Sequence, residues 1–190
     1  MRYCWSLLAC SAVCWAAPII GIAPSPKTVT VGTAFALDVF VTGVSDLYAF
    51  QFDLGYDPAV LTATGIVEGA FLGTGGATFF IGGTIDNGAG SILFSANTLL
   101  TAIGGVNGAG VLARIGFVAT GVGPAQVNLS GVVLLDSSLS GIAADLAPGA
   151  VEVTGATVPE PRPALAMAVL GLALARRVRG RRGLDLQPRG

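Results

Sequence analysis

Residues 29–61 read VTVGTAFALDVFVTGVSDLYAFQFDLGYDPAVL, and this stretch decides the fold class. Apolar residues alternate with polar or small ones at a period of two, which is typical of strands that bury one face. One strand is expected over residues 35–41, with an apolar face of Phe35, Leu37, Val39 and Val41. A second is expected over residues 47–56, with a buried stripe of Tyr48, Phe50, Phe52, Leu54 and Tyr56. In that second strand Ala49, Gln51 and Asp53 face the opposite way.

The rest of the central region continues this pattern. Further strands are expected over residues 78–85, 91–96, 111–119, 125–135 and 150–153. Asp86-Asn87-Gly88 predicts a hairpin turn, and Asp57-Pro58 predicts a short helical turn capped by the aspartate. No segment of this region shows a 3.6-residue apolar period. Many short strands separated by turns predict an all-β fold, an antiparallel β-sandwich.

The N-terminal segment differs from this β-rich centre. Arg2 is followed by an apolar stretch over residues 3–15 and then by Ala16-Ala17-Pro18. A short basic start, an apolar run and small residues at its end are the parts of a secretory signal peptide. We therefore expect residues 1–17 to be a signal peptide. A lipoprotein signal ending at Cys10 is the alternative interpretation.

Composition excludes several kinds of chemistry. All three cysteines, Cys4, Cys10 and Cys14, lie in this expected leader, and the chain has no histidine. The mature chain would therefore lack a disulfide framework, a thiolate zinc site and a histidine-activated nucleophile. Between residues 18 and 158, nine acidic residues stand against two basic ones, a net charge of −7. This charge disfavours nucleic acid as a partner, because the phosphate backbone is repelled.

The central region resembles a cohesin module of the cellulosomal type. The matching features are Val31-Gly32, the strand over residues 35–41, Phe50-Gln51-Phe52 and Tyr56-Asp57-Pro58-Ala59-Val60-Leu61, followed by residues 110–117 and 127–132. The resemblance covers residues 24–155. It implies a jelly-roll sandwich of about nine strands that binds a calcium-loaded dockerin in polysaccharide-degrading assemblies. The fold is also similar to that of carbohydrate-binding modules.

One departure from the family pattern concerns the partner face. In cellulosomal cohesins, the strand before Tyr-Asp-Pro often presents Asn and Asp outward to the dockerin. The matching positions here are Ala49 and Gln51, so the expected contact loses an amide and a charge. We expect the partner face to include Ala49, Gln51, Asp53 and Phe40. Either Phe79 or Phe80 is expected to lie outward as a further apolar contact.

The C-terminal segment has the composition of a sorting signal. Its apolar run over residues 163–175 would form a helix roughly 20 Å long, whereas a bilayer core is about 30 Å thick. The run is thus short for a permanent anchor. After Val158, seven arginines stand against two acidic residues, a net charge of +5. The basic cluster that follows the run and would hold the tail in the cytoplasm is formed by Arg176, Arg177, Arg179, Arg181 and Arg182.

Residues 158–182 resemble the PEP-CTERM sorting signal. The motif Val158-Pro159-Glu160-Pro161 precedes the apolar helix and the arginine cluster in the order that this family shows. The resemblance implies processing by an exosortase, a membrane transpeptidase of Gram-negative bacteria, with transient attachment to the inner membrane. The protein would then reach the cell surface or matrix. Residues 183–190 would form a disordered tail.

Carboxylates of the central region offer little catalytic chemistry. Asp53 and Asp57 are close in sequence, and paired carboxylates can hydrolyse a glycoside. Asp57 is better explained as a turn cap and Asp53 as a solvated strand residue. Asp86-Asn87-Gly88 lacks the further acids that a calcium loop needs. We therefore expect no catalytic site, metal or cofactor.

The sequence as a whole predicts an exported, non-enzymatic β-sandwich that binds a protein or polysaccharide partner. Cohesin-type docking of a dockerin-bearing enzyme is one alternative, and a structural protein of the biofilm matrix is another. All three functions are compatible with the same predicted fold, because function depends on particular sites and not on the fold alone.

Overall fold

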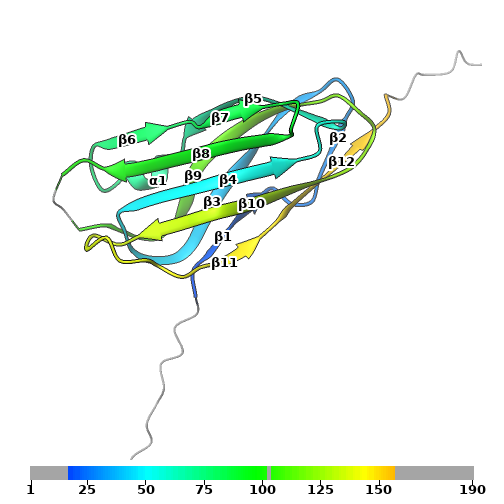
Figure 1. Cartoon of the computed structure of the whole chain (residues 1–190). Helices are drawn as coiled ribbons and strands as arrows, with labels where there is room; N and C mark the ends of the chain where they lie inside the picture. Colours follow the sequence, from blue (N-terminus) through cyan, green and yellow to red (C-terminus); the bar gives the residue numbers. More distant parts are fainter. Residues whose placement is uncertain (1–16, 102–103, 157–190) are drawn as a thin grey trace, which may run out of the picture. The chain divides into compact units, whose positions relative to one another are not determined.

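The computed structural model describes residues 17–101 and 104–156, which contain twelve β-strands and one short helix in two packed sheets (Figure 1). The elements in chain order are β1 (Ile19–Ala23), β2 (Lys27–Thr30), β3 (Ala34–Leu47), β4 (Ala49–Tyr56), β5 (Leu61–Glu68), α1 (Ala70–Gly73), β6 (Thr78–Ile81), β7 (Thr84–Asp86), β8 (Ser91–Leu99), β9 (Val106–Ala119), β10 (Gly123–Leu135), β11 (Asp145–Ala147) and β12 (Gly149–Thr154).

Each sheet joins strands that are distant in the sequence. The five-stranded sheet has the order β11-β1-β3-β9-β5, and the seven-stranded sheet has the order β2-β12-β10-β4-β8-β6, with β7 pairing to β8. Most neighbours are antiparallel, but β1 runs parallel to β11 and β2 runs parallel to β12. The first strands of the domain are therefore closed against its last strands in both sheets.

The core lies between the two sheets and follows from the period-two pattern. Along β4 every second residue is buried, which gives the inward stripe of Phe50, Phe52, Leu54 and Tyr56. Phe52 on β4 is fully buried, and so is Phe117 on β9 of the other sheet. The ring of Tyr56 packs edge-on against Phe117, with 5.3 Å between centroids. Alternation in the sequence thus becomes a shared apolar layer.

The all-β sandwich expected from the sequence is confirmed, with twelve strands rather than about nine. The expectation of one strand over residues 78–85 is wrong, because the chain breaks at Gly82 and Gly83 into β6 and β7. Gly83 has a φ of +76°, and a Cβ there would lie 2.6 Å from the Leu93 carbonyl oxygen. The sequence patterns did not predict β1, β2, β5, β11 or α1.

Both predicted turns form, with the aspartates in the expected roles. Asp57 Oδ1 accepts a hydrogen bond from the Ala59 N–H at 2.9 Å, in a turn rather than a helix. Asp86 Oδ1 accepts hydrogen bonds from the N–H groups of Gly88 and Ala89 in the hairpin between β7 and β8. Asn87 is exposed at the turn, and its Oδ1 accepts hydrogen bonds from the Tyr56 hydroxyl at 2.6 Å and from the Ala63 N–H at 2.8 Å.

The expected terminal signals are not described by the structure. The leader up to residue 16, the motif Val158-Pro159-Glu160-Pro161 and the arginine cluster all lie outside residues 17–101 and 104–156. Within the part that the structure describes, no helix has the length and hydropathy needed to cross a bilayer.

Candidate functional site

The outer side of the seven-stranded sheet carries two cross-strand rows of side chains. Four strands contribute one residue each to a row, because β10, β4, β8 and β6 are neighbours and their registers align. The first row is Leu135, Ala49, Thr98 and Phe79, and the second is Val133, Gln51, Ala96 and Ile81.

These rows form a depression on the surface. The two middle strands present short or flexible side chains, among them Ala49 and Ala96, whereas the flanking strands present longer apolar ones. The result is a partly open hollow of about 210 Å³. Its lining consists of these eight residues together with Phe50 and Asn97. We call it the hollow.

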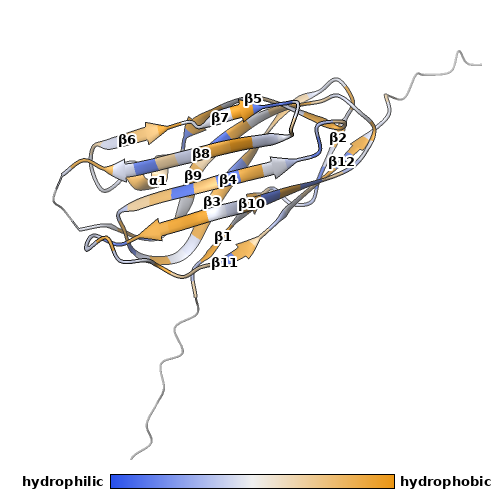
Figure 2. Cartoon of the chain, in the orientation of Figure 1, coloured by the Kyte–Doolittle hydropathy of each residue, from blue (hydrophilic) through white to orange (hydrophobic). Residues whose placement is uncertain are grey.

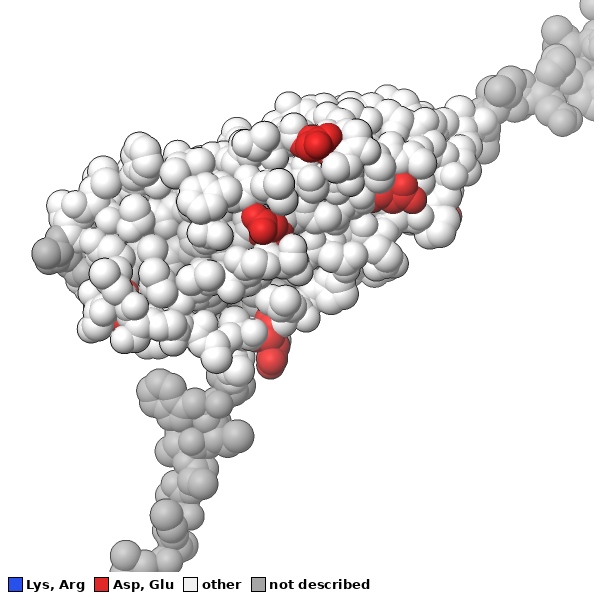
Figure 3. Space-filling view, in the orientation of Figure 1, with Lys and Arg blue, Asp and Glu red and all other residues white. Residues whose placement is uncertain are grey.

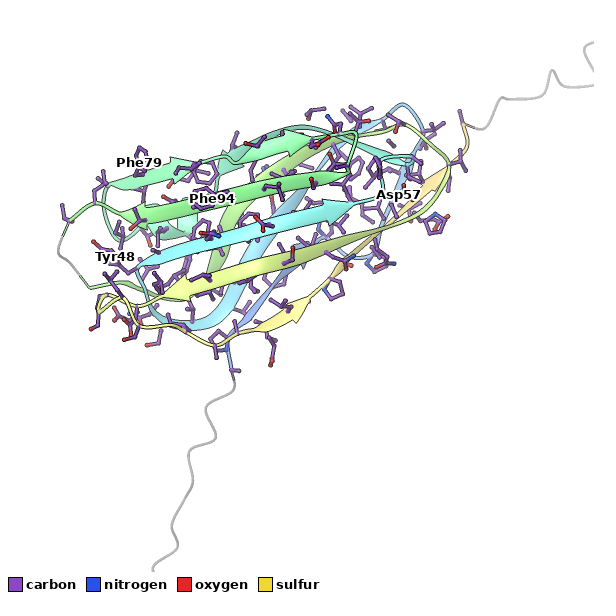
Figure 4. The ribbon with its side chains drawn as sticks, viewed as in Figure 1. Tyr48, Asp57, Phe79 and Phe94 are labelled. Carbon is purple, nitrogen blue, oxygen red and sulfur yellow. The ribbon has the colours of Figure 1, made fainter. Side chains whose placement is uncertain are left out.

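The exposed apolar residues around the hollow extend along the sheet. Phe79 is 57% exposed and Phe94 is 52% exposed, and Figure 4 shows both on the viewed side of the sheet, on β6 and β8. Figure 2 shows hydrophobic colour at the C-terminal end of β10 and in the N-terminal half of β8. We define the apolar face as the hollow together with the exposed side chains of Phe79, Ile81, Leu93, Phe94 and Val133.

Charge is sparse on this side of the domain. The view in Figure 3 shows no Lys or Arg among the described residues and only scattered Asp and Glu. The two basic residues of the described part are Lys27, on the edge strand β2, and Arg114, on β9 of the other sheet. Arg114 is paired with Asp38, with 2.7 Å between Nε and Oδ1. Hydrogen bonding to that carboxylate raises the pKa of Arg114.

The expected partner-face residues do not all lie together. Ala49, Gln51 and Asp53 share the outer side of β4, and the first two line the hollow. Phe40 lies on β3 of the five-stranded sheet, so it is separated from them. Of the two phenylalanines on β6, Phe79 is the outward one, and Phe80 packs against the core.

Sequence reasoning missed Leu93, Phe94, Ile81 and Val133 as members of the face. The alternation pattern could not place Phe94 outward together with Leu93, because a regular strand over residues 91–96 would turn one of the two inward. The structure exposes both of them. Their adjacent outward positions result from an irregularity in the pairing of β4 with β8.

Three carboxylates that could suggest chemistry, those of Asp53, Asp57 and Glu68, form structural hydrogen bonds. Asp53 Oδ1 accepts the Phe94 N–H at 2.7 Å, while Asp57 caps its own turn. A second hollow, beside α1, contains Glu68, which accepts hydrogen bonds from Thr78 Oγ1 at 2.6 Å and Asn97 Nδ2 at 2.8 Å. The described residues contain no cluster of three or more candidate metal ligands. The hollow on the apolar face is lined mainly by apolar side chains.

Comparison with known proteins gives one family match. The family model described as Cohesin domain matches residues 23–153. None of the curated proteins matches this chain in sequence.

Several solved structures share the fold at low sequence identity. A non-cellulosomal cohesin from the archaeon Archaeoglobus fulgidus is 14% identical, with a TM-score of 0.59, over 73% of this chain and 92% of its own. The sixth cohesin of scaffoldin B from Acetivibrio cellulolyticus, solved in complex with a mutant Cel5 dockerin, is 21% identical, with a TM-score of 0.60, over 73% of this chain and 100% of its own. A cohesin from a type I cohesin–dockerin complex of Clostridium thermocellum is 15% identical, with a TM-score of 0.60, over the same shares.

Proposed function

This chain belongs to the cohesin domain family, and from that premise we propose that it is a non-enzymatic binding module whose apolar face docks a dockerin-type protein domain. The observation that carries the proposal is the contiguous apolar surface around the hollow. Exposed apolar patches that gather on one face of a soluble domain mark interaction sites more often than isolated exposed residues do.

The lining of the hollow favours a protein partner over a polysaccharide. Its larger side chains are Phe79, Ile81, Val133 and Leu135, and few polar groups stand among them. A sugar needs hydrogen-bonding groups for its hydroxyls, whereas an aliphatic side chain needs only apolar surroundings. The hollow therefore suits an apolar side chain projecting from a folded partner.

Dockerin-type domains are the first candidates because related structures were solved with them. The cohesins from Acetivibrio cellulolyticus and Clostridium thermocellum are described as cohesin–dockerin complexes. In this chain the outward positions Ala49 and Gln51 carry no charge. The partner we propose thus binds the hollow through apolar contact. The partner's surface around that contact is neutral or basic, because residues 18–158 of this chain carry a net charge of −7.

A binding experiment with a matched control tests this function. Calcium-loaded dockerin domains would be titrated against the protein by calorimetry, with and without a chelator. Phe79→Asp should weaken binding by at least about 30-fold, the loss typical of a central contact residue. Val67→Asp is the control, because Val67 is 58% exposed on β5 of the other sheet.

Two results would contradict the proposal. Absence of binding to every dockerin-type domain of the source organism removes the partner class. Equal losses for Phe79→Asp and Val67→Asp would show that the apolar face is not the contact.

The terminal segments support a further proposal about location. We infer that residues 1–17 direct export and that residues 158–182 act as a PEP-CTERM signal, held at the inner membrane until an exosortase processes it. The order of motif, apolar run and arginines supports this inference. Intact-mass measurement of the protein recovered from its host would report both cleavages. The uncleaved 190-residue chain in the soluble cytosol would overturn it.

A further inference from the structure

Asp53 lies where two neighbouring strands both depart from regular pairing. The register of β4 with β8 shifts between Phe52 and Leu54, the two residues that flank Asp53. The register of β4 with β10 shifts directly after the pair of Asp53 and Ser130. Bulges of this kind reorient side chains and are often found beside functional sites.

On the β8 side, the irregularity places Phe94 in an unusual conformation. Its φ is +59°, a region in which a bulky aromatic residue is an outlier. The Phe94 N–H donates to Asp53 Oδ1 at 2.7 Å, a short bond to a charged acceptor. The carboxylate thereby stabilises a backbone conformation that the side chain itself disfavours.

On the β10 side, a glycine makes room for the same carboxylate. Gly131 has a φ of +57°, and a Cβ at this position would lie 2.7 Å from Asp53 Oδ2. Both strands beside β4 therefore accommodate the Asp53 carboxylate. On β8, Phe94 adopts a strained backbone conformation, and on β10, Gly131 has no side chain that would clash with the carboxylate.

The unusual backbone conformation of Phe94 does not bury its side chain. Phe94 remains 52% exposed and Leu93 remains 51% exposed, whereas regular alternation would have buried one of them. Backbone outliers that the surrounding structure holds in place cluster at active sites and ligand-contact sites, and this one carries an exposed aromatic ring. Phe94 lies on the apolar face beside the hollow, where a rigid aromatic ring can contact a partner (Figure 4).

We propose that Asp53 is a positioning residue, which holds Phe94 outward as the aromatic anchor of the apolar face. The proposal rests on the binding role of that face and adds the residue that organises it. The partner it implies presents an apolar group to the Phe94 ring next to the side chain that enters the hollow.

The first arm of the test needs no partner. Asp53→Ala removes the acceptor of the Phe94 N–H, whereas Asp53→Asn retains a side-chain oxygen at the same place. In NMR spectra, the Phe94 amide proton should move upfield and lose its protection from exchange in Asp53→Ala but not in Asp53→Asn. An unchanged Phe94 amide in Asp53→Ala overturns the proposal.

The second arm measures the apolar face with the neutral fluorescent dye Nile red. Phe94→Ala should weaken dye binding roughly tenfold, the upper range for one aromatic contact. Asp53→Ala should weaken dye binding to a similar extent, and the double variant Asp53→Ala/Phe94→Ala should bind no more weakly than either single variant. Asp53→Asn should bind the dye like wild type. Asp38→Ala is the matched control, because Asp38 is an aspartate on β3 of the other sheet.

The outcomes separate this proposal from the function it rests on. Dye binding that depends on Asp53 and Phe94, together with failure of every dockerin-type domain, removes the proposed partner but keeps the positioning role. Losses that add in the double variant, or a wild-type protein that does not bind the dye, overturn the positioning role.

Discussion

The outer faces of the two sheets differ although both sheets bury the same core. The five-stranded sheet carries an ion pair on its outer face, Asp38 with Arg114, and its exposed apolar residues Ile19, Val67 and Leu146 lie on β1, β5 and β11. The seven-stranded sheet gathers its exposed apolar residues around the hollow instead. Folding requires only the inner faces, so the outer faces are free to differ, and the apolar gathering on one of them is the basis of the proposed binding role.

The largest expected effect comes from the layer that both sheets share. Phe52→Ala and Phe117→Ala should each lower the free energy of unfolding by about 3–5 kcal/mol, because each leaves a cavity in the core. Urea denaturation would measure both. If one of the two variants cost less than about 1 kcal/mol, the two sheets would not share one core equally.

The next effect concerns the link between the sheets. Asn87 bonds to Tyr56 on β4 of one sheet and to Ala63 on β5 of the other. Asn87→Ala should lower the free energy of unfolding by about 1–2 kcal/mol, because the partly buried Tyr56 hydroxyl and the Ala63 backbone groups lose their partner. Asp86→Asn, in the same turn, is the control that retains an oxygen acceptor. Equal stability of Asn87→Ala and wild type would show that the two sheets hold together without this link.

A smaller effect is expected from Asp46, which lies near the C-terminal end of β3. Its pKa is lowered by hydrogen bonds from the Ser137 hydroxyl and the Gly105 N–H. Because the pKa of Asp46 is lower in the folded state than in the unfolded state, its carboxylate stabilises the fold at pH values above the unfolded-state pKa. That stabilisation is lost as the pH falls through the folded-state pKa. Wild type should therefore exceed Asp46→Ala in melting temperature at pH 7, by a margin that shrinks on acidification. A margin independent of pH would contradict this assignment.

The smallest effects are expected on the outer faces themselves. Asp38→Ala should change the free energy of unfolding by less than about 1 kcal/mol, because the guanidinium of Arg114 is largely exposed. Phe79→Ser should change it by about 0.5 kcal/mol or less, because Phe79 is 57% exposed. A large loss for Phe79→Ser would show that the apolar face serves folding rather than binding.

Much of the fold could be predicted from alternation, and the failures have physical causes. The strand expected over residues 47–56 forms as β4 from Ala49 to Tyr56, whereas Leu47 ends β3 and Tyr48 lies between the two strands. The pattern fails in β5, where Gly65 and a register shift after Ala63 break the alternation. It also fails for β1 and β2, which contain few residues and owe their place to pairing with β11 and β12. Such pairing depends on segments more than a hundred residues away.

The candidate site was only partly predictable for the same reason. Ala49 and Gln51 could be placed outward from the strand period, and the structure puts them in the hollow. Phe40 also faces outward, yet on the other sheet, because period two gives the side of a strand and not the sheet to which it belongs. Phe94 depends on a bulge that only the pairing with β4 reveals.

The parallel pairing of β1 with β11 and of β2 with β12 has a mechanical consequence. Tension applied between the beginning and the end of the domain pulls each of these strand pairs lengthwise in opposite directions. Their interstrand hydrogen bonds lie across that direction, so several must break together rather than one after another. A tether at one end and a load at the other would therefore be resisted by both sheets at once.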